Sequence, residues 1–233
     1  MRIDLFIAKH FDLSRQKAQE LIKNGCVLCN QKKIIKTSYD VGIDDNIELM
    51  QENLFVSRAA HKLFGFLKEE RLDGKVILDV GSSTGGFTQV LLMLGAKEVH
   101  CVDVGSDQLD STLRRDNRVR VFEKCDIRDF EKSCEYDFLT CDVSFISIEK
   151  IFNSLKKMSK EMILLFKPQF EVGKSAKRDK KGVLQDVQIV AKALENFEKY
   201  LIEAGYDILR YEKSKISGRE GNEEYFFHIR CRD

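Results

Sequence analysis

Short apolar runs alternate with helical patterns along most of this 233-residue chain, from about residue 53 onward. The runs that we expect to form strands are 75–80, 98–104, 119–124, 136–143 and 161–166. Parallel strands need crossover connections, usually helices, whereas strands joined directly form hairpins. The alternation therefore predicts an α/β domain with a mostly parallel, Rossmann-like sheet, covered by helices on both faces. Two last strands, 206–213 and 223–231, have no helix between them and should form an antiparallel pair at one edge, which makes seven strands.

The first 52 residues follow a different pattern and form the basic end of the chain. Residues 1–36 carry eight Lys and Arg against three Asp and Glu, although the net charge of the whole chain is only +1. Two short helical patterns and a few small strand patterns make a segment too small to carry much chemistry. We therefore divide the chain into a small α+β module, residues 1–52, and a larger domain, residues 53–233, with 53–57 as a linker.

The stretch SRQKAQELIKNGCVLCNQKKIIKTSYDVGIDDNIEL in this basic module resembles the S4 RNA-binding module. The resemblance implies that its basic side chains contact phosphates, which hold RNA without reading its sequence. The residues that we assign to this role are Arg15, Lys17, Lys23, Lys32 and Lys33. The alternative is a solvated basic face on a small packing domain.

A glycine-rich stretch, LDVGSSTGGFT, lies between the first predicted strand of the larger domain and the helix that follows it. A doubly wound fold binds its ligand at such a position. A phosphate loop requires a lysine where Phe87 stands, and a dinucleotide loop requires a glycine where Ser83 stands. A nucleoside ligand without phosphates remains. S-adenosylmethionine, a cationic sulfonium nucleoside, suits glycines and carboxylates without basic residues.

Three aspartates, Asp79, Asp103 and Asp126, stand at the ends of successive predicted strands. Asp103 comes 24 residues after Asp79, at the end of the second strand, where a carboxylate can accept hydrogen bonds from both hydroxyls of a ribose. The alternative interpretation is that each aspartate is only a polar cap at a strand end. Three such acids beside the glycine stretch favour a nucleoside site.

Two further strand ends carry groups suited to acid–base chemistry. Asp142 follows the fourth predicted strand and Lys167 the fifth. Neighbouring parallel strands end at one crevice, so these two side chains should face one site. Pro168 follows Lys167 and suits the end of the strand, because proline donates no ladder hydrogen bond. A lysine becomes a base only when its pKa falls, which desolvation and a second ammonium promote and carboxylates oppose.

Seven motifs, in the order SRAAHKL, LDVGSSTGGFT, VDVGSDQL, CDVSFISI, FKPQFEVGK, KGVLQD and GNEEYF, are similar to those of the TlyA family. This family comprises hemolysin-like proteins and ribosomal RNA 2'-O-methyltransferases whose catalytic domain resembles that of FtsJ. The resemblance implies a catalytic tetrad of Lys62, Asp142, Lys167 and Glu224, with Lys167 as the general base. Glu223 is an adjacent competitor for the last position.

The resemblance also implies a cofactor, S-adenosylmethionine, and a substrate, a cytidine ribose in the 23S RNA of the large ribosomal subunit. The residues that we expect around the cofactor are Asp79, Gly81, Ser83, Gly85, Phe87, Asp103 and Asp126. Longer family members also modify small-subunit RNA, and this chain resembles the short form. Arg58, on the helix of Lys62, and Lys174, in the basic stretch GKSAKRDKKG, are expected to contact RNA. We expect that stretch to be a mobile loop near the active site, and the alternative is a solvated loop without a role.

Other classes of function have less support in the sequence. No apolar run approaches the roughly 20 residues of a membrane span, so we expect a cytoplasmic protein that does not insert into membranes. Seven scattered cysteines indicate reduced thiols, and the pair Cys26 and Cys29 lacks the second pair of a zinc site. We expect no metal and no obligatory protein partner. The alternatives to an enzyme are a non-catalytic ribosome- or RNA-binding protein and a hemolysin.

Overall fold

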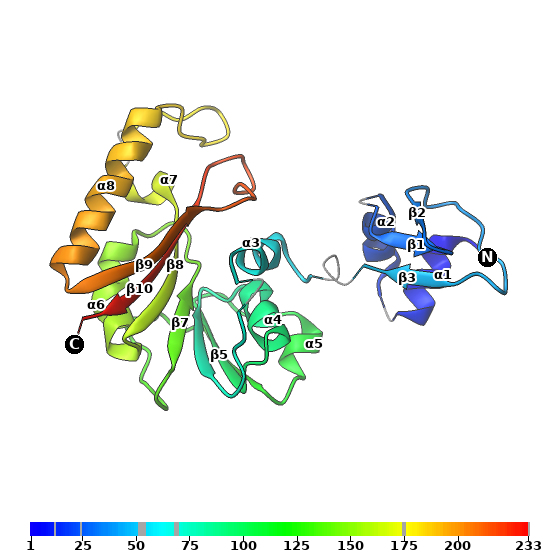
Figure 1. Cartoon of the computed structure of the whole chain (residues 1–233), viewed down its shortest axis with the longest axis horizontal. Helices are drawn as coiled ribbons and strands as arrows, with labels where there is room; N and C mark the ends of the chain where they lie inside the picture. Colours follow the sequence, from blue (N-terminus) through cyan, green and yellow to red (C-terminus); the bar gives the residue numbers. More distant parts are fainter. Residues whose placement is uncertain (12, 24, 51–54, 68–69, 174–175, 233) are drawn as a thin grey trace. The chain divides into compact units, whose positions relative to one another are not determined.

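Figure 1 shows a computed structural model that describes all residues except 12, 24, 51–54, 68–69, 174–175 and 233. The chain divides into two compact units, Met1–Phe55 and Val56–Asp233. Each unit buries a hydrophobic core of its own.

The amino-terminal unit contains two helices and a small antiparallel sheet. The elements are α1 (Ile3–His10), α2 (Arg15–Lys23), β1 (Val27–Cys29), β2 (Lys32–Ile34) and β3 (Ile47–Leu49). The strand order is β2-β1-β3. The apolar residues of both helices recur at spacings of three and four, so each helix buries one face against the sheet. Its core contains Ile3, Ile7, Leu21, Ile22 and Val27, all buried.

The second unit is built on one sheet of seven strands with the order β6-β5-β4-β7-β8-β10-β9. The strands are β4 (Val76–Val80), β5 (Glu98–Asp103), β6 (Val119–Glu123), β7 (Phe138–Cys141), β8 (Glu161–Phe166), β9 (Tyr206–Lys213) and β10 (Tyr225–Cys231). The first five are parallel to one another, while β10 is antiparallel to both β8 and β9. The predicted α/β class, the seven strands and the antiparallel edge pair are confirmed.

Helices cover both faces of this sheet, as two adjacent phenylalanines of β10 demonstrate. Side chains of successive strand residues point to opposite faces. Phe226 stacks on Phe66, with ring centroids 4.6 Å apart, and Phe227 meets Phe197 at 5.1 Å. The helices that carry these partners therefore lie on opposite faces (Figure 1). The helices of this unit are α3 (Arg58–Leu67), α4 (Gly86–Met93), α5 (Ser111–Arg114), α6 (Ile148–Met158), α7 (Pro168–Glu171) and α8 (Val187–Glu203).

Pro168 follows the end of a strand, as expected. Strand β8 ends at Phe166, and Pro168 also begins the short helix α7. Proline suits the first position of a helix because its φ is fixed near the helical value and the missing N–H has no partner there in any helix. Lys167 therefore lies at a strand-to-helix junction, with extended backbone (φ −122°, ψ 96°).

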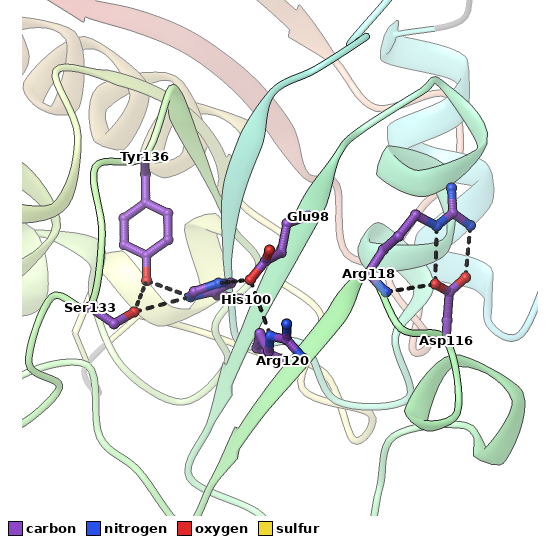
Figure 2. Close-up of polar contacts among 7 residues, drawn as sticks. All are labelled: Glu98, His100, Asp116, Arg118, Arg120, Ser133 and Tyr136. Carbon is purple, nitrogen blue, oxygen red and sulfur yellow. Dashed lines mark hydrogen bonds and ion pairs between the residues drawn. The ribbon is translucent and has the colours of Figure 1, made fainter.

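A closed polar network supports β5 at the end of the sheet opposite to its ligand crevice. Figure 2 shows the buried His100, whose Nδ1 lies 2.8 Å from the hydroxyl of Tyr136 and whose Nε2 lies 2.7 Å from Glu98 Oε1. Ser133 Oγ is 3.3 Å from His100 Nδ1, and Arg120 donates to Glu98 Oε1 at 3.2 Å. Both ring nitrogens are thus satisfied inside the fold, which is what a buried imidazole requires.

Candidate active site

The glycine stretch forms a tight turn between β4 and α4, where side chains have no room. Gly81 has φ 79°, and a Cβ there would lie 2.7 Å from the backbone oxygen of Asp142. Gly85 has φ 89° and precedes α4 directly. Only glycine adopts such angles without strain and permits so close an approach. Gly81 thus brings backbone against the carboxyl end of β7, and a Cβ on Gly85 would meet the side chains of Leu109 and Leu113.

A first cavity, of about 340 Å³, opens at the carboxyl ends of β4, β5 and β7. Its lining includes Asp103, Asp126 and Asp142, and no lysine or arginine among the described residues. The N–H groups of Ser83 and Gly105 donate to the two oxygens of Asp103, at 2.8 and 2.7 Å, and so fix this carboxylate. An acidic cavity with apolar walls suits a cationic nucleoside and disfavours a phosphate.

Asp126 occupies the same cavity but is already paired. Its carboxylate accepts hydrogen bonds from the guanidinium of Arg128 at 2.6 and 2.9 Å. These hydrogen bonds hold the pKa of Asp126 below its usual value. Asp126 therefore lines the cavity as an ionised carboxylate whose orientation is fixed by Arg128.

A second cavity, of about 520 Å³, holds all four residues of the expected tetrad. Lys62 Nζ donates to Glu224 Oε2 at 2.6 Å, and both side chains are buried. Lys167 Nζ lies 2.5 Å from Asp142 Oδ1 and donates to Ser144 Oγ at 3.0 Å. The buried Asp142 Oδ1 therefore has the Lys167 ammonium as its ion-pair partner, and a carboxylate oxygen with two lone pairs can accept a further hydrogen bond.

The two cavities share part of their lining, namely Gly81, Ser83, Asp142 and Ser144. A ligand in the acidic cavity can therefore present a group to the cavity of the lysines. The second cavity contains a candidate base, Lys167, with a carboxylate and a hydroxyl that orient it. Glu223 faces away from this arrangement, because it pairs with Lys213 and accepts from Tyr225 Oη at 2.6 Å.

Comparison with known proteins agrees with this geometry. The family model for FtsJ-like methyltransferases matches residues 55–231, and that for the S4 domain matches residues 1–47. The chain belongs to the FtsJ-like methyltransferase family, in its TlyA branch. A relative from Campylobacter jejuni, named 23S rRNA (cytidine-2'-O)-methyltransferase TlyA, is 42% identical, with 98% of each chain covered. A relative from Mycobacterium tuberculosis, named 16S/23S rRNA (cytidine-2'-O)-methyltransferase TlyA, is 36% identical and covers 93% of this chain and 84% of its own.

Solved structures show the same architecture. A hemolysin-named protein from Streptococcus thermophilus is 32% identical and superposes with a TM-score of 0.72, covering 100% of this chain and 89% of its own. No helix among the described residues of this TlyA-family chain is long and apolar enough to cross a membrane. No cluster of three or more metal-ligating side chains occurs in that part of the chain either.

Asp79 lies behind the glycine turn of the TlyA-family chain and does not line either cavity. Its side chain is fully buried, and its two oxygens accept hydrogen bonds from Thr88 at 2.7 Å and Thr140 at 2.8 Å. Burial raises the pKa of Asp79 to about 6, against the opposing effect of the two hydroxyls. The geometry favours support of the turn over contact with a cofactor. Phe87 is buried too, but it lines the second cavity.

The residues expected to contact RNA lie in varied surroundings. In the amino-terminal unit, Arg15 donates to the buried Asp4 at 3.1 Å, Lys17 donates to a backbone oxygen at 3.4 Å, and Lys23 is exposed. In the methyltransferase unit, Arg58 donates to the backbone oxygen of Ser217 at 2.9 Å. Lys174 lies outside the described residues.

Three residues of the site were not identified from the sequence. Ser144 binds Lys167, Arg219 lines the second cavity, and Phe145 lines the first. Phe145 is 90% exposed and has a positive φ of 67°, unusual for a bulky residue. Its position three residues after Asp142, in the turn that leaves the fourth strand, was the available signal for both Phe145 and Ser144. Arg219 gave no signal, because nothing in its local pattern shows which loop faces the cavity.

Proposed function

We propose that this chain transfers a methyl group from S-adenosylmethionine to the 2' oxygen of a cytidine in ribosomal RNA, with 23S RNA of the large subunit as substrate. The observation that carries this proposal is the pair of joined cavities, one acidic and one containing Lys167. The curated relatives named for this reaction support the choice of substrate.

The first cavity, which Asp103, Asp126 and Asp142 line and which we call the acidic cavity, suits the methyl donor. Asp103 is oriented by two backbone N–H groups and can accept hydrogen bonds from ribose hydroxyls. Val104 and Ile127 provide apolar walls for a base. Gly81 and Ser83 line this cavity, and the absence of a side chain on Gly81 allows the ligand to approach the backbone. S-adenosylmethionine supplies an electrophilic methyl group on a positively charged sulfur when it is bound.

The second cavity, which Lys62 and Lys167 line and which we call the lysine cavity, contains the groups that would activate the RNA hydroxyl. In its neutral amine form, Lys167 Nζ would accept the proton of the 2' hydroxyl as that oxygen attacks, since a ribose hydroxyl is a poor nucleophile until it loses its proton. Asp142 and Ser144 orient Nζ, and Asp142 Oδ1 can accept a further hydrogen bond. The pair of Lys62 and Glu224 also lines this cavity. These contacts hold the reacting groups in position before the reaction. Less conformational entropy is then lost on reaching the transition state.

Binding of the RNA would involve both units. Arg15, Lys17 and Lys23 of the S4 unit offer charges to phosphates, independent of sequence. Arg58 and Arg219 extend the positive charge to the rim of the lysine cavity. The exposed ring of Phe145 offers a face on which a nucleotide base can stack.

The test is to incubate unmodified large and small ribosomal subunits with methyl-labelled S-adenosylmethionine. We expect label on a cytidine 2' oxygen of large-subunit RNA with the unaltered chain, and a loss of at least about 10³-fold in Lys167→Ala because the general base is absent. Binding of S-adenosylmethionine by Lys167→Ala should stay close to that of the unaltered chain. Lys192→Ala is the matched control, since that lysine is exposed on α8 and pairs with Glu195.

Other results would refute the proposal. Label on a base nitrogen would show that the reaction is a different methyl transfer. Equal transfer by Lys167→Ala and the control would exclude the assigned base. RNA binding without any label would favour the non-catalytic RNA-binding protein, and label confined to the small subunit would refute the choice of 23S RNA.

A further inference from the structure

Two loops meet beside the lysine cavity. The basic loop (residues 176–184) precedes α8, and the β9–β10 loop (residues 214–224) carries Glu224 at its end. They lie side by side in Figure 1, where the first is yellow to orange and the second is orange-red. Two hydrogen bonds between the side chain of Asn222 and backbone groups of the basic loop join them directly. One loop offers charge to the solvent and the other contributes to the reaction site.

The basic loop is held in one shape by two of its own side chains. Asp179 Oδ1 accepts hydrogen bonds from the backbone N–H groups of Lys181 and Val183, at 2.8 and 2.9 Å. Arg178 donates to three backbone oxygens, those of Gln169, Gly173 and Ala176, at 2.7 to 3.0 Å. Three lysines, Lys177, Lys180 and Lys181, consequently stand exposed on an ordered turn.

Asn222 makes the connection to the β9–β10 loop. Its side chain is buried; Oδ1 accepts from the N–H of Leu184 at 3.1 Å, and Nδ2 donates to the oxygen of Gly182 at 3.2 Å. Its backbone oxygen accepts from the N–H of Gly218 at 2.8 Å. The side-chain amide of Asn222 therefore both donates to and accepts from the basic loop. The backbone oxygen of the same residue forms a hydrogen bond within the β9–β10 loop.

Glu224, two residues after Asn222, lies in the same loop and lines the lysine cavity. Its backbone oxygen accepts from the N–H of Ser214 at 2.8 Å, and its carboxylate accepts from Lys62 at 2.6 Å. The guanidinium of Arg58, one turn before Lys62 on α3, donates to the oxygen of Ser217. The β9–β10 loop is thus attached to the basic loop on one side and to the helix of Lys62 on the other.

We propose that Asn222 is a positioning residue for methyl transfer, a latch that couples the basic loop to Glu224. RNA phosphates bound by Lys177, Lys180 and Lys181 then fix the position of the Lys62–Glu224 pair through Asn222. The coupling rests on the proposed function, because RNA is the ligand of the basic loop. Because of this coupling, the three lysines contribute to the rate of methyl transfer as well as to the affinity for RNA.

A first experiment tests the latch without any substrate. Trypsin cleaves after the lysines of the basic loop, and cleavage requires local opening of that loop. We expect cleavage to be at least about tenfold faster in Asn222→Ala, since opening then breaks two fewer hydrogen bonds. Asn222→Asp retains an acceptor for the N–H of Leu184 but has no donor for Gly182. Its cleavage rate should therefore lie between those of the unaltered chain and Asn222→Ala. Asn153→Ala, an exposed position on α6, is the control. Equal rates for Asn222→Ala and the control would overturn the latch.

A second experiment tests the coupling by single-turnover methylation of large subunits at a series of RNA concentrations. Asn222→Ala should lower the saturating rate by about tenfold with an unchanged dissociation constant for S-adenosylmethionine. Lys180→Ala combined with Lys181→Ala should raise the half-saturating RNA concentration and also lower the saturating rate by about threefold. In the Asn222→Ala background, the lysine substitutions should affect only the half-saturating concentration.

Additive effects on the saturating rate in the combined variant would overturn the proposal, because uncoupled sites add. An unchanged saturating rate in Asn222→Ala would also overturn it. Asp179→Ala, which loosens the basic loop and leaves Asn222 intact, should reproduce the rate loss if Asn222→Ala folds poorly. Absence of label with the unaltered chain would instead refute the proposed function, and the trypsin rates would then decide on the latch alone.

Discussion

Each of the two compact units holds a fully buried aspartate, and the two units satisfy it in opposite ways. In the amino-terminal unit, Asp4 accepts hydrogen bonds from Arg2, Arg15 and Gln19, at 2.8 to 3.1 Å. In the methyltransferase unit, Asp79 has the hydroxyls of two threonines as its side-chain partners. Burial alone would raise both pKa values, but the arginines and Gln19 outweigh it and lower that of Asp4 to about 2.

The comparison shows how the partner, and not burial alone, decides what a buried acid does. Asp4 stays ionised and holds two half-exposed guanidiniums at the surface, where they suit phosphates. Asp79, with a pKa raised to about 6, supports the glycine turn with less charge. The negative charge of the nearby Asp142 also raises the pKa of Asp79, so neutral partners suit an acid that carries less charge.

Separation of the two units should have the largest effect on function. A chain shortened to residues 56–233 should bind S-adenosylmethionine within about twofold of the full chain, because the acidic cavity is lined by that unit alone. Methylation of large subunits should fall about 10³-fold at moderate salt, since the phosphate contacts of the S4 unit are lost. Rate measurements at several salt concentrations and calorimetric titration with the cofactor check both parts. Undiminished methylation would contradict a role for the S4 unit in binding.

Asp79→Asn should change the pH dependence of stability. A folded-state pKa raised from 3.8 to about 6 means that the stabilising contribution is complete below pH 3.8 and is lost as the pH rises through 6. The loss is up to about 3 kcal/mol at pH 7.5, because one pKa unit corresponds to about 1.4 kcal/mol. Urea unfolding at pH 5 and pH 7.5 should show about half of this loss, about 1.4 kcal/mol, in the unaltered chain and none in Asp79→Asn, because the other half occurs below pH 5. Asp207→Asn, at an exposed position, is the control.

Asp4→Asn should have the opposite pH signature. The lowered pKa means that the contribution of Asp4 is present above pH 3.8 and is lost as the pH falls through about 2. At neutral pH, we expect the unfolding free energy of the amino-terminal unit to fall by about 2 kcal/mol, a value kept modest because both guanidiniums are half exposed. Calorimetry at pH 7 and pH 3 measures this, with Asp44→Asn as an exposed control. Equal stability at pH 7 would show that the arginines do not stabilise the fold through Asp4.

The smallest effect should come from Thr88→Val, which removes one hydroxyl from Asp79 and preserves the shape of the side chain. We expect a loss of about 1 kcal/mol at pH 7.5, where the carboxylate needs its donors most, and a smaller loss at pH 5. Thr140→Val is the matched variant, because Thr140 donates to the other oxygen of the same carboxyl. Identical losses at both pH values would indicate that only packing was changed.

The sequence was sufficient for the sheet, because the strands depend on local patterns. The apolar period of β4 to β8 defined the strands, and their order along the chain placed Asp142 and Lys167 at one crevice. The exclusion of a phosphate loop depended on Phe87 alone. These inferences need only the identity of a residue and its position at the end of an element.

The partners of individual side chains could not be predicted in this way. Lys62 and Glu224 are 162 residues apart, and their contact depends on how α3 packs against the last strand. Asp79 was expected at the cofactor, but the side chains of a strand alternate between faces, and no pattern showed that two threonines would enclose it. The basic stretch before α8 was expected to be a mobile loop that contacts RNA. In its described part, from residue 176, the hydrogen bonds come from Asp179 and from an asparagine about 40 residues later, which no local pattern indicates.

The place of β10 between β8 and β9 has a consequence for the order of events in folding. Among the described strands, β9 joins the sheet only through β10, so the two must dock on β8 together. Glu224 and Asn222 are synthesised after every other residue assigned to the site. Contacts between segments so distant in sequence form slowly, because their loop-closure entropy must be paid first. A growing chain can therefore complete its cofactor crevice while its reaction site is still unfinished, and catalytic competence comes as the final step of maturation.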